Sequence, residues 1–437
     1  MFVRVISWIV VSSNKQEPGG IVSETQCDRL RPINHNLFGN QSGSHDIVFI
    51  PELPEKRVKK LSDGKTIGIG VVGAGFARTT QVPGFLNCDG ARVVAITSRH
   101  RERAESVAKE FGIENVASDW RELIQRDDID LVSIVTPPAT HMEITLAALE
   151  RRKAVLCEKP MAMNADEAKS MTERAHEAGV LALIDHELRF LNGRRKMRAM
   201  LREGVIGNVR HCNYVFRSDY RGVLGTWDWW SDVTMGGGTL GAIGSHAIDS
   251  FRWMLGTEVS EVCCMLTTHV TERPEKGRSP QPAGSLPGAP DAGPMRRVTT
   301  DDEAKLMFRF AGSPLTKNAT GAASLSVVES GKHENRFEVY GSKGALLVEE
   351  TGELWHSPAG SAAWQPVNVE RDAIAPGMRE GSWSRGFTAF ACAIVASLRE
   401  GRRTVPEAAT FDDGYRVQLV LDAARASNER GCWSRVE

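Results

Sequence analysis

The order of hydrophobic and polar positions divides the chain into stretches of different character. Between residues 66 and 190, short apolar runs alternate with segments of helical periodicity. The runs lie at 67–72, 92–96, 130–135 and 154–157, and the helical segments include 101–110 and 143–151. Strands and helices that alternate at this spacing are typical of a parallel sheet with helices on both faces. We therefore predict an α/β domain of this kind over residues 66–190.

After about residue 190 the rhythm changes. Apolar runs at 209–216, 305–310 and 337–340 are separated by loops, a pattern that favours a largely antiparallel sheet. We expect residues 191–437 to form an α+β domain for substrate binding and oligomerisation, with a large, mainly antiparallel open sheet and a Pro-, Gly- and Ser-rich loop at 273–294. Residues 1–65 show no sustained period, so we expect a disordered or loosely attached extension there.

Composition narrows the class of partner. The chain has 437 residues, enough for two or three domains, and a formal net charge of −1 without a Lys/Arg-rich run, which removes the electrostatic footprint of a nucleic-acid binder. No apolar run is long enough to span a bilayer. The eight cysteines form no CxxC pair, so we expect no metal site, and thiols in a reducing, cytoplasmic compartment. A small molecule remains as the expected partner, with neither nucleic acid nor membrane.

A glycine-rich turn follows the first predicted strand. Its sequence is Gly73-Ala74-Gly75-Phe76-Ala77, which gives the first two glycines of a dinucleotide fingerprint, while Arg78 stands at the third position. The first glycine permits the tight turn, and the second lets the backbone approach a pyrophosphate at a helix N-terminus. In this context the turn predicts a Rossmann dinucleotide-binding domain over residues 66–190.

The end of the second predicted strand bears on the choice of cofactor. NAD-binding domains usually place an acidic residue about 20 positions after the glycines. This chain has Ser98 and Arg99 at that place, 98 − 75 = 23 positions on, with Arg103 nearby. A hydroxyl and guanidinium groups can bind a 2′-phosphate. We therefore favour NADP(H), with NAD(H) as the alternative.

Three further motifs point to a family. Thr136-Pro137-Pro138-Ala139-Thr140-His141 is followed by Cys157-Glu158-Lys159-Pro160, and then by Gly236-Gly237-Gly238-Thr239-Leu240 leading to Gly244-Ser245-His246-Ala247-Ile248-Asp249. In this order and spacing they resemble the glucose–fructose oxidoreductase / inositol dehydrogenase (Gfo/Idh/MocA) family, from residue 66 to the C-terminal helix. The resemblance implies an NAD(P)-dependent dehydrogenase or reductase that acts on CH–OH groups of a sugar, polyol or sugar derivative. We expect a homodimer or homotetramer.

The resemblance also implies roles for individual residues. Lys159 corresponds to the lysine that reaches the reacting hydroxyl, and His246 to the general base; both would also bind substrate. The family places an aspartate four residues before this histidine, but here Ala242 stands there. Asp249 lies roughly on the same helix face and is a candidate to bind substrate or orient the ring. Without the usual carboxylate, we expect the base to titrate near the unperturbed value of about 6.5.

The remaining candidates are expected to contact the cofactor or to line the substrate pocket. The resemblance implies cofactor contacts from the turn at 73–77, from the end of the second strand, and from these residues: Thr136, Pro137, Pro138, His141, Glu158, Lys159 and His186. Glu158 is alternatively a partner for Lys159, and His186 alternatively a buried structural residue. Trp229, within Trp227-Asp228-Trp229-Trp230, is a candidate to contact the apolar face of a sugar.

Two other functions remain compatible with this sequence. Some relatives cleave glycosides through a transient redox cycle on bound NAD, and the arginine at position 99 argues against that function. The fold also serves as a catalytically silent, sugar-responsive regulator, which the loss of the aspartate at Ala242 favours and the presence of Lys159 and His246 opposes.

Overall fold

The computed structural model describes residues 65–222, 225–275 and 294–437. Contacts divide the chain into two units, residues 1–60 and 61–437, and only the second contains described residues. The expectation for the extension at 1–65 falls almost entirely outside the described residues, as does most of the loop expected at 273–294. Arg273 and Pro274 belong to a short strand, β9 (Glu272–Pro274), which pairs with β10 (Met295–Arg297).

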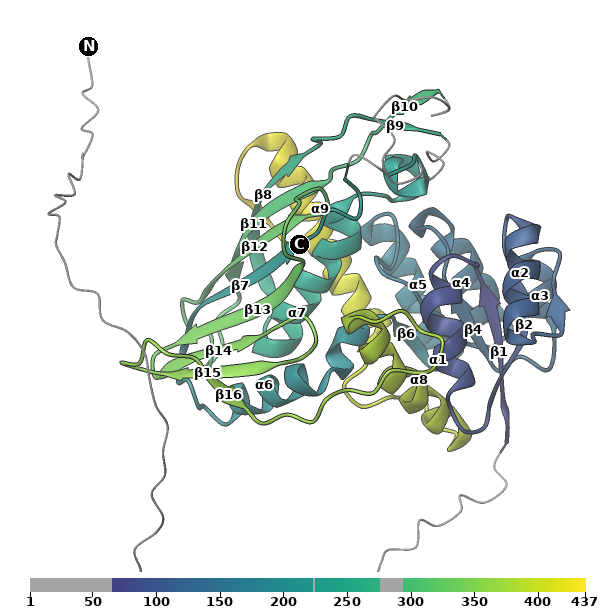
Figure 1. The fold of residues 1–437 in the computed structure, drawn as a ribbon, viewed down its shortest axis with the longest axis horizontal. Coiled ribbons are helices and arrows are strands. Elements are labelled where there is room, and N and C mark those ends of the chain that lie inside the picture. Colours follow the sequence, from purple (N-terminus) through teal and green to yellow (C-terminus); the bar gives the residue numbers. More distant parts are fainter. Residues whose placement is uncertain (1–64, 223–224, 276–293) are drawn as a thin grey trace, which may run out of the picture. The chain divides into compact units, whose positions relative to one another are not determined.

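Two sheets organise the described part of the chain (Figure 1). The first has the order β17-β6-β5-β4-β1-β2-β3, parallel except for the edge strand β17. Its strands are β1 (Ile67–Val72), β2 (Ala91–Thr97), β3 (Asn115–Val116), β4 (Leu131–Ile134), β5 (Ala154–Cys157), β6 (Ala182–Ile184) and β17 (Ala409–Thr410). The order of strands changes direction beside β1, which is where such sheets bind nucleotides.

Helices cover this sheet, and local sequence sets their limits. They are α1 (Val82–Leu86), α2 (Arg101–Phe111), α3 (Trp120–Gln125), α4 (His141–Glu150) and α5 (Ala165–Ala178). Helix α5 begins where the Asn164 side chain accepts a hydrogen bond from the Glu167 backbone N–H, and ends at Gly179 in the left-handed region. Strand β1 is buried along its whole length, as its uninterrupted apolar sequence predicts.

The second sheet is mainly antiparallel, with the order β16-β15-β14-β13-β7-β12-β11-β8-β18. Only β7 and β12 run parallel. Its strands are β7 (Val209–Arg217), β8 (Val259–Thr267), β11 (Glu303–Phe310), β12 (Thr320–Ser326), β13 (Glu334–Gly341), β14 (Gly344–Val348), β15 (Leu354–Pro358), β16 (Gln365–Val367) and β18 (Ser434–Arg435). One face packs against helices α6 (Asn192–Arg202), α7 (Ser245–Leu255) and α9 (Phe411–Arg430) (Figure 1).

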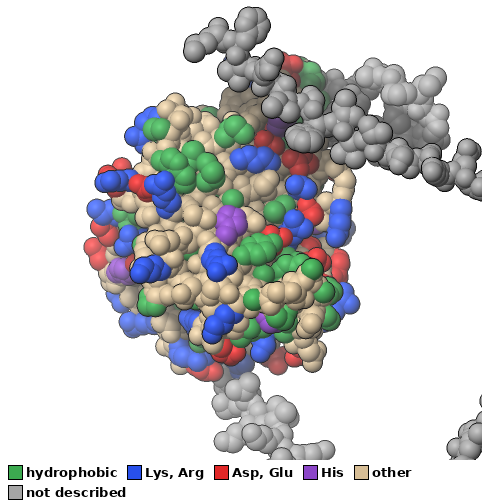
Figure 2. All heavy atoms as spheres, turned by 90° about the vertical axis from the view of Figure 1, so that its left-hand side faces the viewer, with side chains coloured by type: hydrophobic (Ala, Val, Ile, Leu, Met, Phe, Trp, Pro, Cys, Tyr) green, Lys and Arg blue, Asp and Glu red, His purple; other side chains and the backbone are tan. Residues whose placement is uncertain are grey.

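In several strands of this sheet, buried side chains alternate with more exposed ones that point to the opposite face. In β11, Ala304, Leu306 and Phe308 are buried, whereas Met307 and Arg309 are exposed. Figure 2 views the molecule from this side and shows small groups of hydrophobic side chains among lysine, arginine and acidic side chains. This pattern is what a sheet with one core face and one open face requires.

The C-terminal part of the chain returns to the first sheet. Helix α8 (Ser382–Arg399) buries Phe387, Phe390 and Ile394 in the core of the dinucleotide-binding half, and β17 extends its sheet. A single boundary at residue 190 therefore does not separate the two halves, because α8 and β17 come after it in the chain and pack with the first sheet. The predicted fold class, a Rossmann domain followed by an α+β domain with a large antiparallel sheet, is confirmed. Within the described residues, no helix is both long and apolar enough to cross a membrane.

Candidate functional site

The glycine turn after β1 has the shape that a pyrophosphate needs. Gly73 has φ +117°, and a side chain there would lie 2.2 Å from the Val135 carbonyl oxygen, so only glycine fits. Gly75 is exposed and faces open space, with nothing within 4 Å of the position of a Cβ. A helical segment follows, as a π turn (Ala77–Gln81) that continues into α1. An open backbone beside a helix N-terminus fits the diphosphate of a dinucleotide.

The end of β2 lies beside this turn, because β1 and β2 are paired up to Val72 and Thr97. Ser98 is half-buried there, and Arg99 and Arg103 are exposed. Among the ion pairs of the described residues, neither arginine has a carboxylate partner. The structure thus places these three residues on one side of the turn.

Lys159 follows β5 and reaches the second half of the molecule. Its side chain is half-buried, and its Nζ donates a hydrogen bond to the Ala242 carbonyl oxygen over 3.3 Å. Ala242 belongs to a π turn (Leu240–Gly244) that leads directly into α7. Turns of this kind often occur at functional sites, since they redirect backbone carbonyls. The ammonium group therefore lies next to the helix that carries His246.

His246 is buried in the first turn of α7, with 1% of its surface exposed. Its Nδ1 lies 3.5 Å from Nδ1 of His186, and the two ring centroids are 5.3 Å apart. Nε2 of His246 is buried and has no hydrogen-bond partner among the described residues. Burial, together with the positive charge of Lys159, holds the pKa of His246 well below its usual value. The expectation of titration near 6.5 fails because it took account of the missing carboxylate but not of burial.

Trp383, in the first turn of α8, covers this histidine. The indole and imidazole centroids are 4.5 Å apart, and Nζ of Lys159 lies 5.9 Å from the indole centroid. The Trp383 side chain is half-buried. Sequence reasoning missed this residue, because Trp383 belongs to none of the motifs and reaches the site only when α8 returns to the first sheet.

Three buried carboxyl groups, those of Glu158, Asp185 and Glu187, lie close enough to Lys159 to be influenced by its charge. The Gln81 amide donates to Oε1 of Glu158 and to Oδ2 of Asp185, each over 2.8 Å. Glu187 is buried near them. Burial raises the pKa of Glu158, raises that of Asp185 well above its usual value and raises that of Glu187 to about 8. Glu187 therefore keeps its proton at neutral pH, and burial favours the protonated forms of the other two carboxyl groups as well. Sequence reasoning found only Glu158 among the three.

Glu158 does not form an ion pair with the lysine ammonium in the described structure. Its Oε2 instead accepts a hydrogen bond from the Lys159 backbone N–H over 3.3 Å. His141 is fully buried, with Nε2 2.8 Å from the Thr136 carbonyl and Nδ1 3.1 Å from the Pro160 carbonyl. Both ring nitrogens of His141 therefore face the backbone and join the segments that follow β4 and β5. Thr136 and Pro137 remain half-buried at the edge of the site, whereas Pro138 is buried.

Asp249 is held by an arginine. Its Oδ2 accepts from Nε of Arg189 over 2.9 Å, and its Oδ1 accepts from Nη2 over 2.5 Å. Both side chains are almost completely buried. Because Arg189 occupies both oxygens, Asp249 does not orient the ring of His246 in this structure, and it joins α7 to the segment that carries His186.

Trp229 lies in a short helical turn (Trp229–Ser231), half-buried, with its ring centroid 5.8 Å from that of Trp230. No contact between Trp229 and Lys159 or His246 is present among the described aromatic and cation–π pairs. Its predicted role in substrate binding therefore remains a prediction, while Trp383 holds the position beside the candidate catalytic groups.

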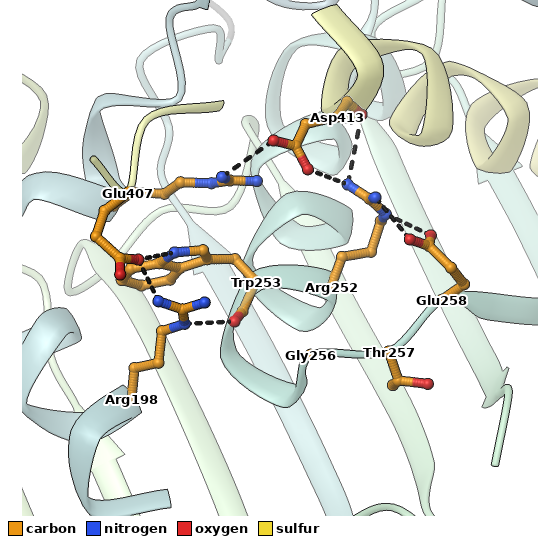
Figure 3. A pocket seen from close by; sticks show the side chains of 9 residues that line it. Arg198, Arg252, Trp253, Gly256, Thr257, Glu258, Glu407 and Asp413 are labelled. Carbon is orange, nitrogen blue, oxygen red and sulfur yellow. Dashed lines mark hydrogen bonds and ion pairs between the residues drawn. The ribbon is translucent and has the colours of Figure 1, made fainter. Parts of the chain in front are cut away.

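A cavity of about 470 Å³ lies elsewhere, at the C-terminal end of α7 (Figure 3). Arg198 and Trp253 both bond to Glu407, and Arg252 bonds to Glu258 and Asp413. The charged residues in its lining are Arg189, Arg198, Arg252, Glu258, Glu407 and Asp413. Positive and negative charges balance, so this cavity has no surplus charge with which to bind an ion.

Comparisons with known proteins cover both parts of the described fold. Residues 67–186 match an oxidoreductase family described by its NAD-binding Rossmann fold, and residues 194–347 match the GFO/IDH/MocA C-terminal domain. Levoglucosan dehydrogenase of Pseudarthrobacter phenanthrenivorans is 28% identical over 397 residues, covering 84% of this chain and 98% of the relative. The human glucose-fructose oxidoreductase domain-containing protein 2 is 28% identical over 388 residues, covering 85% of this chain and 93% of that protein.

Solved structures are similar over the same length. An oxidoreductase domain protein from Kribbella flavida has a TM-score of 0.72 at 26% identity, covering 85% of this chain and all of that one. Levoglucosan dehydrogenase in complex with NADH and L-sorbose has a TM-score of 0.71 at 25% identity, covering 85% of this chain and 99% of that one.

Proposed function

The chain belongs to the Gfo/Idh/MocA family of NAD-binding oxidoreductases, and we propose that it transfers a hydride between a nicotinamide cofactor and a carbinol or carbonyl carbon of a sugar, polyol or sugar derivative. The observation that carries this proposal is the meeting of Lys159, His246 and Trp383 at one place. Lys159 comes from the carboxyl end of a parallel strand, where α/β sheets bind their ligands, and His246 comes from the second domain.

In the direction of oxidation, Nε2 of His246 takes the proton of the substrate hydroxyl. Lys159 donates a hydrogen bond to the same oxygen and stabilises the negative charge that develops on it. A nicotinamide cofactor held at the glycine turn and at the carboxyl ends of the parallel strands would supply the hydride acceptor for the substrate carbon. His246 is suited to the role because its Nε2 has no other partner among the described residues and burial keeps the ring neutral. Because this nitrogen is buried, a neighbouring side chain has to move before a substrate can bond to it, and we propose that the half-buried Trp383, 4.5 Å from the imidazole between ring centroids, is that side chain.

The substrate class follows from the chemistry of the surroundings. An indole face suits the C–H side of a sugar ring, and the ammonium of Lys159 suits its hydroxyl groups. The levoglucosan dehydrogenase to which the chain is similar has been described in complexes with levoglucosan and with L-sorbose. We therefore include anhydrosugars and ketoses among the first substrates to test.

We further propose a preference for NADP(H). Ser98, Arg99 and Arg103 offer a hydroxyl and two exposed guanidinium groups at the end of β2, where a 2′-phosphate would lie. The complexes of levoglucosan dehydrogenase contain NADH, which favours NAD(H). Titration of the protein with NADPH and NADH, followed by cofactor fluorescence, decides between them: tighter binding of NADPH supports this proposal, and equal or tighter binding of NADH contradicts it.

One observation favours a second function. The position four residues before His246 holds Ala242, whose side chain is buried and has no polar atom, and a catalytically silent sugar-responsive regulator could dispense with a carboxylate there. Such a protein would bind cofactor and sugar without turnover. The two functions are separated by the same assay, because only the enzyme consumes cofactor.

The experiment is a substrate panel of aldoses, ketoses, inositols and anhydrosugars with either cofactor, followed by variants. Lys159→Ala and His246→Ala are each expected to lower kcat by about 10²–10⁴-fold, the usual contribution of a positioned acid–base group. Lys169→Ala and His176→Ala, both exposed on α5, are matched controls that should retain turnover. Wild-type turnover in both site variants would refute the assignment, and cofactor binding without any turnover would favour the regulator.

A further inference from the structure

Two neutral histidines face each other at the site. Nδ1 of His186 and Nδ1 of His246 are 3.5 Å apart, and both rings are almost fully buried. Burial lowers the pKa of His186 to about 4 and that of His246 well below its usual value. At neutral pH each ring therefore has one N–H, and a hydrogen bond between the two Nδ1 atoms requires that one of them donates to the other, which fixes both tautomers.

The surroundings decide which ring donates. If His186 donated, the proton of His246 would be on Nε2, which is buried without a partner among the described residues. A buried N–H without an acceptor is costly and rare, whereas an unused acceptor lone pair is tolerated more often. If His246 donates through Nδ1, its Nε2 has a lone pair instead. The second arrangement leaves no orphaned donor on His246, and it places the proton of His186 on its Nε2, which, unlike Nε2 of His246, is not among the fully buried polar atoms without a partner in the described residues.

We propose that His186 is the positioning residue of the candidate base: its Nδ1 accepts the hydrogen bond of the His246 Nδ1–H and keeps the lone pair of Nε2 available to the substrate hydroxyl. This inference rests on the proposed function and deepens it. In serine proteases a buried carboxylate performs the equivalent task for a catalytic histidine, and its loss gives the wrong tautomer. Here Ala242 cannot do so and Asp249 is occupied by Arg189.

A neutral partner changes the acidity of the base. The charged groups that act on His246 are Lys159 and Arg194, which both disfavour its protonation, while Asp249 and Arg189 act on His186 with opposite signs. A neutral imidazole stabilises an imidazolium less than a carboxylate does. We therefore expect kcat/KM to stay constant as pH falls through 6.5, because the folded pKa of His246 lies below that value.

The tautomer can be measured without turnover. In protein labelled with ¹⁵N-histidine, two-bond proton–nitrogen spectra distinguish protonated from unprotonated ring nitrogens, and loss of signals in the His186 and His246 variants assigns them. In the wild type we expect a protonated Nδ1 and an unprotonated Nε2 on His246. A protonated Nε2 would overturn the proposal, whether or not a substrate has been found, so its failure is distinct from failure of the proposed function.

Two substitutions separate positioning from packing. His186→Leu removes the acceptor and is expected to move the proton of His246 to Nε2 and to lower kcat by roughly 10–100-fold, as loss of an orienting partner does. His186→Asn presents an amide oxygen from about the place of Nδ1, and should restore the tautomer and most of kcat. If both variants keep the wild-type tautomer, or if Asn fails where the fold is intact, His186 is a packing residue and the proposal is wrong.

A separate observation concerns two thiols, one in α8 and the other just after α1. Sγ of Cys88, after α1, lies 3.0 Å from Sγ of Cys392 in α8, which is within about 1 Å of the covalent S–S length. Cys88 is buried, and Cys392 is half-buried and accessible. The contact with Cys88 lowers the pKa of the Cys392 thiol, whereas the same contact and burial raise that of Cys88, so Cys392 is the sulfur of the pair that forms a thiolate more easily.

The structure assigns Cys88 and Cys392 as a reversible disulfide pair that responds to small disulfide oxidants such as oxidised glutathione. The Cys392 thiolate attacks one sulfur of the oxidant and displaces a glutathione thiolate. Cys88 then loses its proton, attacks Sγ of Cys392 and displaces the second one. The two cysteines are oxidised by two electrons, which reduce one glutathione disulfide to two thiols. The disulfide bond would join the segment after α1 to helix α8.

The test exposes the folded protein to excess oxidised glutathione, alkylates the remaining thiols and identifies linked peptides by mass spectrometry. We expect the Cys88–Cys392 peptide pair, a raised melting temperature because a cross-link restricts the unfolded chain, and reversal by reductant. Cys432 is exposed, and Cys432→Ser is the matched control that should retain the cross-link. Persistence of both thiols in excess oxidant, or a cross-link that survives in Cys392→Ser, would overturn the assignment.

Discussion

The buried pair Arg189–Asp249 makes a sharp prediction about how the site is held together. Arg189 follows His186 by three residues, and Asp249 follows His246 by three. The guanidinium binds both carboxylate oxygens, at 2.9 and 2.5 Å, with side-chain exposures of only 6% and 4%. The pair therefore connects the two histidine-bearing segments through fixed geometry.

Arg189→Met would leave the Asp249 carboxylate buried without a counter-ion. Breaking a buried pair in this way costs about 3–5 kcal/mol. Because the unfolding entropy grows with chain length, at about 2.1 cal/mol/K per residue, this should lower Tm by about 4–6 °C for a folded chain of this size. The double variant Arg189→Met/Asp249→Asn removes the uncompensated charge, and should regain at least half of the loss. The second partner of Arg189, Asp413, retains Arg252 in every variant.

The assay is thermal and urea unfolding at pH 7, with kcat measured on the same samples. Arg174→Met is the control, since its pair with Glu177 has side chains 46% and 62% exposed and should contribute no more than about 1 kcal/mol. The reasoning is refuted if Arg189→Met costs as little as Arg174→Met, or if the double variant is no more stable than the single one.

Three further outcomes follow from the site. Arg99→Ala should weaken NADPH binding by roughly 10–100-fold while NADH binding changes little, since one charge-assisted contact is worth about 1.5–3 kcal/mol; fluorescence titration measures both, and a parallel loss for the two cofactors would contradict a 2′-phosphate contact. Burial raises the pKa of Glu187 to about 8, so the folded state loses stability as pH rises from the unfolded value of about 4.3 through 8; Glu187→Gln should flatten the fall of Tm in that range, and an unchanged slope would exclude Glu187 as its source. Trp383→Leu should raise KM for the sugar more than Trp229→Leu does, because Trp383 is the only tryptophan that contacts the candidate base among the described aromatic pairs; steady-state kinetics decides, and the reverse order would indicate that Trp229 is the tryptophan that binds the sugar.

Much of the dinucleotide-binding half could be predicted from local sequence. Strand β1 is apolar at every buried position except for its glycines, and it leads into a turn that requires glycine at position 73. Such signals are local, because a strand buried on both faces and a turn with positive φ each restrict the residues at their own positions. The order and spacing of the motifs likewise indicated Lys159 and His246 from the sequence alone.

The pairing of distant strands could not be predicted from local sequence. The apolar runs at 209–216, 305–310 and 337–340, separated by loops, predicted a largely antiparallel sheet, but not that β7 and β12 run parallel in the middle of it. Pairing between distant strands depends on the whole set of buried faces, and no single run contains that information. The return of α8 to the first sheet is of the same kind.

Patterns in the sequence were enough to predict the fold class and a glycine turn suited to a diphosphate, and the resemblance of the motifs to a family indicated the two residues proposed to act on the substrate. Three contacts became visible only in the tertiary structure: Trp383 packs over His246, Asp249 binds Arg189, and His186 lies within 3.5 Å of the candidate base. The physical reason is that a side chain's identity fixes what it can donate or accept, whereas its partner and its pKa depend on burial and on charges that come from segments far apart in the chain.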